Sequence, residues 1–197
     1  MGVLAAIVRG SAAINIIVGR IASWFALAIV VICFTVVVQR YVFSVSYLWM
    51  QDLYIWLNGA MFTAVAGYAL MRDDHVRVDI FYRPASPRRK AVIDMIGTLV
   101  FLLPFAWIVL SYGWPFVRRS WSYWEGSANV GGLPGLFVLK SFIIGFGVLL
   151  ALQGLAIIAR SILVLRGEEH RLPLALRYPQ EAPGPGVVTE PLGEGAR

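Results

Sequence analysis

The sequence predicts an all-α membrane protein with four transmembrane helices and both termini in the cytoplasm. Three observations lead to this prediction. Hydrophobic residues make up 59% of the 197 residues and charged residues 14%, and the mean hydropathy is +0.73, whereas about a quarter of the residues in soluble domains are charged. The apolar residues gather in four runs, each close to the ~20 residues that a helical span needs. The charged residues lie mostly between these runs.

The charged segment 71–79 (MRDDHVRVD) divides the chain into two hydrophobic halves. A charge at the centre of a bilayer costs roughly 2.5 to 3.5 kcal/mol even on lenient insertion scales. We therefore expect this segment in an aqueous, cytoplasmic loop. Residues 80–82 (IFY) follow it and are compatible with a short interfacial helix in the same loop.

The first half predicts two spans. Residues 21–38 carry no charge and predict a first span over about 15–39. A cleaved signal peptide is the alternative, but its apolar core is ~7 to 15 residues long, and no A-x-A site follows here. The second span covers about 48–71. Its residues Gly59, Thr63 and Gly67 share one face, and small residues at this spacing let membrane helices pack closely, here within the chain or against a partner.

The second half predicts two more spans and a tail. Ser86 and Pro87 have the pattern of a helix cap followed by proline, and they precede a third span over about 91–115 that Pro104 can kink. Residues 118–135, rich in Trp, Tyr, Gly and Ser, indicate an interfacial loop. The fourth span covers about 136–159. Residues 1–166 would form the membrane domain, and the tail 167–197 would be disordered after about residue 179.

The distribution of basic residues predicts the orientation of the four spans. Positive charges are enriched in cytoplasmic loops. With the N-terminus inside, eleven basic residues up to position 171 lie in the cytoplasm: Arg9, Arg20, Arg72, Arg77, Arg83, Arg88, Arg89, Lys90, Arg160, Arg166 and Arg171. Four lie outside: Arg40, Arg118, Arg119 and Lys140. Both termini are therefore expected in the cytoplasm.

The chain lacks the residue patterns of common enzymes and cofactor sites. Both histidines, His75 and His170, fall outside the predicted spans, so a haem held between membrane helices is not expected. The single cysteine, Cys33, allows no internal disulfide. The basic residues flank apolar runs and form no continuous face for nucleic acid. We expect no enzyme activity, no cofactor and no metal.

Polar residues inside the predicted spans are few. Thr35, Asn58 and Thr63 are expected to make ordinary interhelical hydrogen bonds. The ionisable residues Asp52, Asp94 and Lys140 fall near span ends. A self-sufficient carrier normally has polar or ionisable groups near the membrane midplane, so the chain is predicted to hold a partner protein.

Residues 46–159 resemble the small membrane subunit of tripartite ATP-independent periplasmic (TRAP) transporters, the DctQ-like family. The resemblance lies in Trp49 and Asp52 ahead of residues 55–60 (IWLNGA), and in residues 72–79 (RDDHVRVD). Residues 125–134 (EGSANVGGLP) with Lys140 resemble one branch of the family. The acidic residue early in the second span is usually glutamate in that family, and here it is Asp52.

The resemblance implies a bacterial inner-membrane complex with a large permease subunit, which carries the substrate and ion sites, and a soluble periplasmic solute-binding protein. This chain would brace the permease during secondary, ion-driven uptake of an organic acid or similar solute, and would also contact membrane lipid. Two alternatives keep the fold: an anchor or scaffold subunit of another membrane complex, and a homo-oligomeric channel.

The candidate partner-interface residues lie on the second span, in the two polar loops and at the start of the fourth span. They are Trp49, Asp52, Trp56, Gly59, Thr63, Gly67, His75, Arg118, Arg119, Glu125, Asn129 and Lys140. Asp52 and Lys140 begin helices that enter from the same side, so we expect them at similar depth. We hypothesise that they form an ion pair, directly or through Glu125; the alternative is that each side chain extends separately to water.

Overall fold

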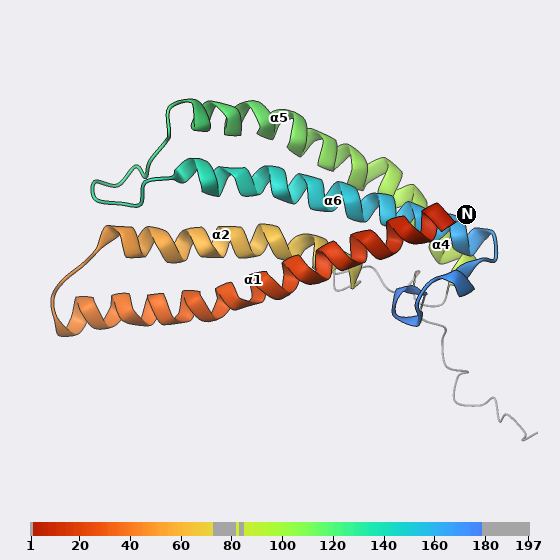
Figure 1. Cartoon of the computed structure of the whole chain (residues 1–197), viewed down its shortest axis with the longest axis horizontal. Helices are drawn as coiled ribbons and strands as arrows, with labels where there is room; N and C mark the ends of the chain where they lie inside the picture. Colours follow the sequence, from red (N-terminus) through yellow and green to blue (C-terminus); the bar gives the residue numbers. More distant parts are fainter. Residues whose placement is uncertain (1, 73–81, 83–84, 179–197) are drawn as a thin grey trace, which may run out of the picture.

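The computed structural model of the chain describes residues 2–72, 82 and 85–178, and its main elements are helices (Figure 1). They are α1 (Gly2–Val42), α2 (Leu48–Met71), α4 (Pro87–Gly97), the π-helical turn η1 (Thr98–Leu102), α5 (Leu103–Ser122), α6 (Leu136–Leu165) and two 3-10 turns, η2 (Glu169–Arg171) and η3 (Leu174–Leu176). In the described part, four helical segments are long and apolar enough to cross a membrane. The predicted fold class, an all-α membrane protein with four spans, is confirmed.

Near the turn 43–47 the four long helices lie side by side in the order α5, α6, α2, α1, and towards its start α1 crosses α2 and also packs against α6 (Figure 1). We call the end with the turn 43–47 and the loop 123–135 the loop end. The terminal end holds the start of α1 and the segment 166–178 (Figure 1). A row of helices cannot enclose a large core, and only 11% of the most apolar window is buried in each of the first three spans, against 39% in α6. Much of the apolar surface therefore faces outward.

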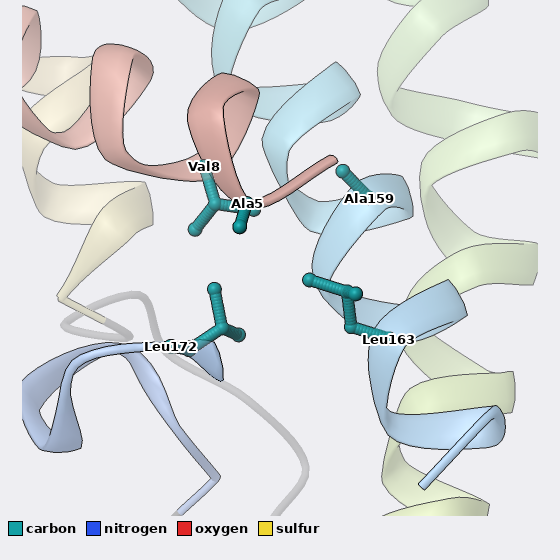
Figure 2. Packing of buried hydrophobic residues seen from close by; sticks show 5 residues of the cluster. All are labelled: Ala5, Val8, Ala159, Leu163 and Leu172. Atoms are coloured by element: carbon teal, nitrogen blue, oxygen red, sulfur yellow. The ribbon is translucent and has the colours of Figure 1, made fainter. Parts of the chain in front are cut away.

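Among the described residues, the clusters of buried hydrophobic side chains lie at the terminal end. Figure 2 shows Ala5 and Val8 of α1 facing Ala159 and Leu163 of α6, with Leu172 closing the cluster from the segment after α6. The buried residues of α1 recur every three or four positions, as one helix face requires. They begin at Ala5, so α1 starts well before the predicted span and reaches about 62 Å at 1.5 Å per residue.

The small-residue face of α2 packs within the chain. A Cβ added at Gly59 would lie 3.3 Å from Leu139 of α6. One added at Gly67 would overlap Asn15 Oδ1 of α1 and lie 3.2 Å from Leu149 of α6. This face was expected to pack either within the chain or against a partner. The contacts that the structure describes are with α1 and α6 of the same chain.

The third span is interrupted ahead of Pro104. In η1 the backbone N–H of Leu103 donates to the carbonyl of Thr98, five residues back, which is the bond of a π-helical turn. A proline ring clashes with the carbonyl four residues before it in a regular helix, and the wider turn makes room for it. At the start of α4, Ser86 Oγ accepts a hydrogen bond from the backbone N–H of Arg89 at 3.5 Å, which confirms the predicted cap.

Several expectations were wrong or lie outside the described residues. Helix α5 continues to Ser122, so Arg118 and Arg119 lie on a helix rather than in a loop. Thr35 and Thr63 donate to carbonyls of their own helices, Thr35 to Val31 and Thr63 to Gly59 and Ala60, because a threonine hydroxyl reaches back one turn. The predicted interfacial helix over residues 80–82 lies mostly outside the described residues. His75 and the tail after residue 178 lie wholly outside them.

Candidate functional site

Asp52 organises the loop end. It lies in the first turns of α2 and is 6% exposed. Its Oδ1 accepts a hydrogen bond from Asn129 Nδ2 at 3.0 Å, and its Oδ2 accepts one from the backbone N–H of Leu133 at 3.1 Å. A buried carboxylate needs such donors, because desolvation without them is very costly. Asp52 therefore ties α2 to the loop between α5 and α6.

The loop reaches Asp52 because residues 126–134 fold back on themselves. Gly126 and Pro134 form an antiparallel bridge, and the N–H of Ser127 donates to the carbonyl of Leu133 at 3.0 Å. Gly132 lies against both the Asp52 carboxylate and the Ser127 hydroxyl, and an added Cβ would overlap them. Gly132 is thus required for the close approach of the loop.

Lys140, in the first turns of α6, forms an ion pair with Glu125 of the loop. Ser120 Oγ donates to the same carboxylate, and Lys140 Nζ lies 4.3 Å from the centroid of the Phe116 ring. The hydrogen bond from Lys140 lowers the pKa of Glu125, and the bond from Ser120 lowers it further.

The expected direct pair of Asp52 and Lys140 is wrong, although both lie at the loop end. The carboxylate of Asp52 is taken by the loop donors Asn129 and Leu133. The ammonium group of Lys140 is taken by Glu125. The predicted link through Glu125 is only half present. Glu125 pairs with Lys140, but among the described residues no ion pair connects Glu125 with Asp52.

Aromatic side chains of α5 and of the loop after it pack against α6 beside these polar groups. Trp121 and Trp124 pack edge-on against Phe137, with ring centroids 4.5 Å and 5.1 Å away. Trp121 Nε1 donates to Ser141 Oγ at 2.9 Å. The loop end is therefore held by hydrogen bonds, an ion pair and ring contacts together.

A second polar cluster lies at the terminal end. Asp94 of α4 and Arg160 of α6 form an ion pair at 3.1 Å, with side chains 8% and 11% exposed. Tyr178 donates its hydroxyl to Asp94 Oδ2 at 2.7 Å, and its ring centroid lies 4.3 Å from the Arg160 guanidinium carbon. Burial is the main cause that raises the pKa of Tyr178. This cluster holds the segment after α6 against α4 and α6.

Buried polar side chains also join α1 to α6. Ser11 Oγ and Asn15 Nδ2 both donate to Gln153 Oε1, at 3.1 Å and 3.0 Å. The sequence did not predict this group of hydrogen bonds. It indicated Arg160 only as one of the basic residues on the cytoplasmic side and not as the partner of Asp94. The signal for Asn15 and Gln153 was their polarity inside apolar runs.

The remaining predicted interface residues do not gather at one point. Trp49 is exposed, and Trp56 is partly buried next to Gly135. Arg118 and Arg119 are exposed on α5, and Asn129 is exposed although its amide binds Asp52. Among the described residues, no group of three or more His, Cys, Asp or Glu could hold a metal ion. The polar groups found here fasten helices and loop together.

Comparison with known proteins identifies the family. Neither the search of curated proteins nor the search of solved structures returned a match. A family model, described as the DctQ component of tripartite ATP-independent periplasmic transporters, matches residues 29–164, from within α1 nearly to the end of α6. This match covers more than half of the chain, and the chain therefore belongs to the DctQ family of TRAP transporter components.

Proposed function

We propose that this chain is the small, non-catalytic membrane subunit of a bacterial TRAP transporter and that it braces the large permease subunit. The large subunit would carry the solute and the coupling ion in a secondary symport reaction, and a periplasmic binding protein would deliver the solute. Membership of the DctQ family supports the general assignment to such a transporter.

The observation that carries this proposal is the row of helices. Three of the four spans bury only 11% of their most apolar window within the chain. The only clusters of buried hydrophobic residues found in the described ranges lie at the terminal end, away from the middle of the spans. A subunit with this shape offers broad helix faces to a larger membrane protein and has little core of its own.

The positions of the charges support the same role. A self-sufficient carrier normally has ionisable groups near the membrane midplane. The described ion pairs instead lie at the two ends of the row. Glu125 pairs with Lys140 at the loop end, and at the terminal end Asp94 pairs with Arg160 and Glu168 with Arg171. They stabilise the ends of the helices and leave transport to the partner.

The proposal includes an orientation, with the loop end in the periplasm and the terminal end in the cytoplasm of the inner membrane. The excess of basic residues on the side of the termini supports it. A reporter that is active only in the cytoplasm should then work when fused after Arg197 and fail when inserted at the exposed Val130. The opposite pattern would reverse the orientation.

The loop end would face the binding protein. Arg118 and Arg119 are exposed there, and charges at the rim of an interface act mainly on the rate of encounter. Reversing both charges should slow transport more at low binding-protein concentration than at saturation. An equal loss at both concentrations would indicate a defect in assembly instead.

Co-purification tests the central proposal. The tagged chain, co-expressed with the large permease subunit of its transporter and extracted in mild detergent, should retain that subunit in an equimolar complex. A chain that purifies alone, or only as a homo-oligomer, would contradict the proposal.

A further inference from the structure

One stripe of α2 faces outward along most of the helix. It consists of Leu48, Ile55 and Phe62, which are 40%, 55% and 76% exposed, together with the exposed Asn58. These positions recur at intervals of three, four or seven residues, so they lie on one side of the helix. We call them the Asn58 stripe. The adjoining flank of the helix carries Asp52, Gly59 and Gly67, which contact the loop, α6 and α1.

Asn58 lies near the middle of the span. Helix α2 runs from Leu48 to Met71, which places Asn58 about 15 Å from the first residue and about 20 Å from the last at 1.5 Å per residue. No water is present at this depth of a bilayer to bind a side-chain amide. An amide transferred to hydrocarbon without a hydrogen-bonding partner is strongly disfavoured.

The chain supplies no such partner to Asn58 in its described part. Thr35 and Thr63, which also lie inside spans, bind carbonyls of their own helices, but Asn58 has no side-chain hydrogen bond among the described residues. The sequence of the segment after α2 is dense in aspartate and arginine, and that of the tail after residue 178 contains several glutamates. Such charges disfavour either segment as a cover at the midplane.

We propose that the Asn58 stripe docks against a transmembrane helix of the large permease subunit, and that this helix offers Asn58 a hydrogen-bonding side chain. This inference rests on the proposed function and adds the face and the residue that make the contact. Lipid chains cannot replace the partner, because they carry no donor or acceptor. Phe62, one turn beyond Asn58, would insert into the same helix surface.

Photo-crosslinking in intact membranes tests the face. A benzophenone amino acid replaces Phe62 in the tagged chain, which is co-expressed with the large subunit, and the same probe at Leu174, 81% exposed after α6, serves as a control for random collisions. The probe at position 62 should crosslink to the large subunit, and the probe at 174 should do so much less. The retained large subunit is measured in the same samples by co-purification.

The outcomes separate the two proposals. Co-purification with a crosslink from position 62 to the large subunit supports both. Co-purification with a crosslink only to a second copy of this chain, only to lipid, or to nothing overturns the Asn58 stripe while the proposed function stands. Loss of co-purification already in the unsubstituted chain overturns the proposed function, and this inference with it.

Substitution of Asn58 tests the hydrogen bond. Asn58→Leu should weaken association with the large subunit about fivefold to thirtyfold, the range expected for one interhelical bond in a membrane. Asn58→Gln keeps the amide and should retain most of the affinity. The thermal unfolding of the isolated chain should stay unchanged in both variants, because the Asn58 side chain makes no hydrogen bond to any described residue. Association as tight in Asn58→Leu as in the unsubstituted chain would overturn the proposed bond.

Discussion

The carboxylate of Asp52 in α2 and the backbone of Gly132 in the loop are in such close contact that no side chain fits between them. These residues are far apart in the sequence, and their contact holds the loop 123–135 against the start of α2. Leu133, the next residue, donates its backbone N–H to the same carboxylate.

Gly132→Ala should therefore destabilise the loop end. The added methyl group would overlap Asp52 Oδ2 and the Ser127 hydroxyl, so the loop must move and lose its hydrogen bonds to Asp52. Overpacking of this kind costs about 1 to 3 kcal/mol, measurable as a lower unfolding temperature in detergent. Gly126→Ala is the matched control, since a Cβ there meets only Pro134 Cα at 3.9 Å. Equal effects of the two substitutions would contradict this reading of the contact.

Two double-mutant cycles should distinguish the two polar pairs at the loop end. Asp52→Asn and Lys140→Met are expected to have additive effects on unfolding, because the two side chains have different partners. Glu125→Gln and Lys140→Met should be clearly non-additive, because each removes the same ion pair. Strong coupling between Asp52 and Lys140 would indicate a direct interaction that the structure lacks.

The stability of the loop end should depend on acid pH through Glu125. Its pKa is lowered in the folded chain, mainly by the hydrogen bond from Lys140, so the charged form stabilises the fold above the ordinary glutamate pKa. This contribution is lost as the pH falls through the lowered value. The unfolding temperature of the unsubstituted chain should thus fall more steeply in acid than that of Glu125→Gln. In a Lys140→Met background the difference between Glu and Gln should shrink, and an unchanged difference would assign the effect to another group.

Substitutions in the polar cluster of Asp94, Arg160 and Tyr178 should lower the stability of the chain by different amounts. Arg160→Met removes the guanidinium from the buried Asp94 carboxylate, and the loss of one partner of a buried ion pair costs roughly 3 to 5 kcal/mol. Tyr178→Phe removes one hydrogen bond and keeps the ring over Arg160, at a cost of about 1 kcal/mol. Thermal unfolding of both variants measures the order, and a Tyr178→Phe variant as unstable as Arg160→Met would show that the order is wrong.

The small-residue face of α2 predicts a loss of stability in the chain itself. Gly67→Leu would force Asn15 and Leu149 away from α2 and should lower the unfolding temperature even without the large subunit. Gly145→Leu on α6 is the control, because an added Cβ there meets nothing within 4 Å. A Gly67→Leu variant that is stable alone but fails to bind the large subunit would instead place Gly67 at the interface.

Hydropathy and caps predicted the helices well, because the length of an apolar run and a residue such as Ser86 act locally. The start of α1 was missed because Arg9 and Arg20 lower the hydropathy of that stretch, and its packing on α6 through Ala5 and Val8 is a tertiary effect.

The depth of the ionisable side chains in the membrane was also predictable, whereas the groups that they bind were not. Helix direction alone placed Asp52 and Lys140 at the same end. Which group each one binds depends on the fold of residues 126–134, where the bridge between Gly126 and Pro134 presents Leu133 to Asp52. Asp94 was expected near a span end, but its partner Arg160 lies on another helix, and no local pattern connects the two.

The core at the terminal end has a consequence for biosynthesis. Helices α1 and α2 are neighbours in the sequence and can pair as soon as both have left the ribosome. Ala5 and Val8 pack against Leu163 and Leu172 as well, so the first turns of α1 lack these neighbours until almost all of the described chain has been translated. The contact between the first turns of α1 and the residues around Leu172 therefore forms only after all four spans have been made.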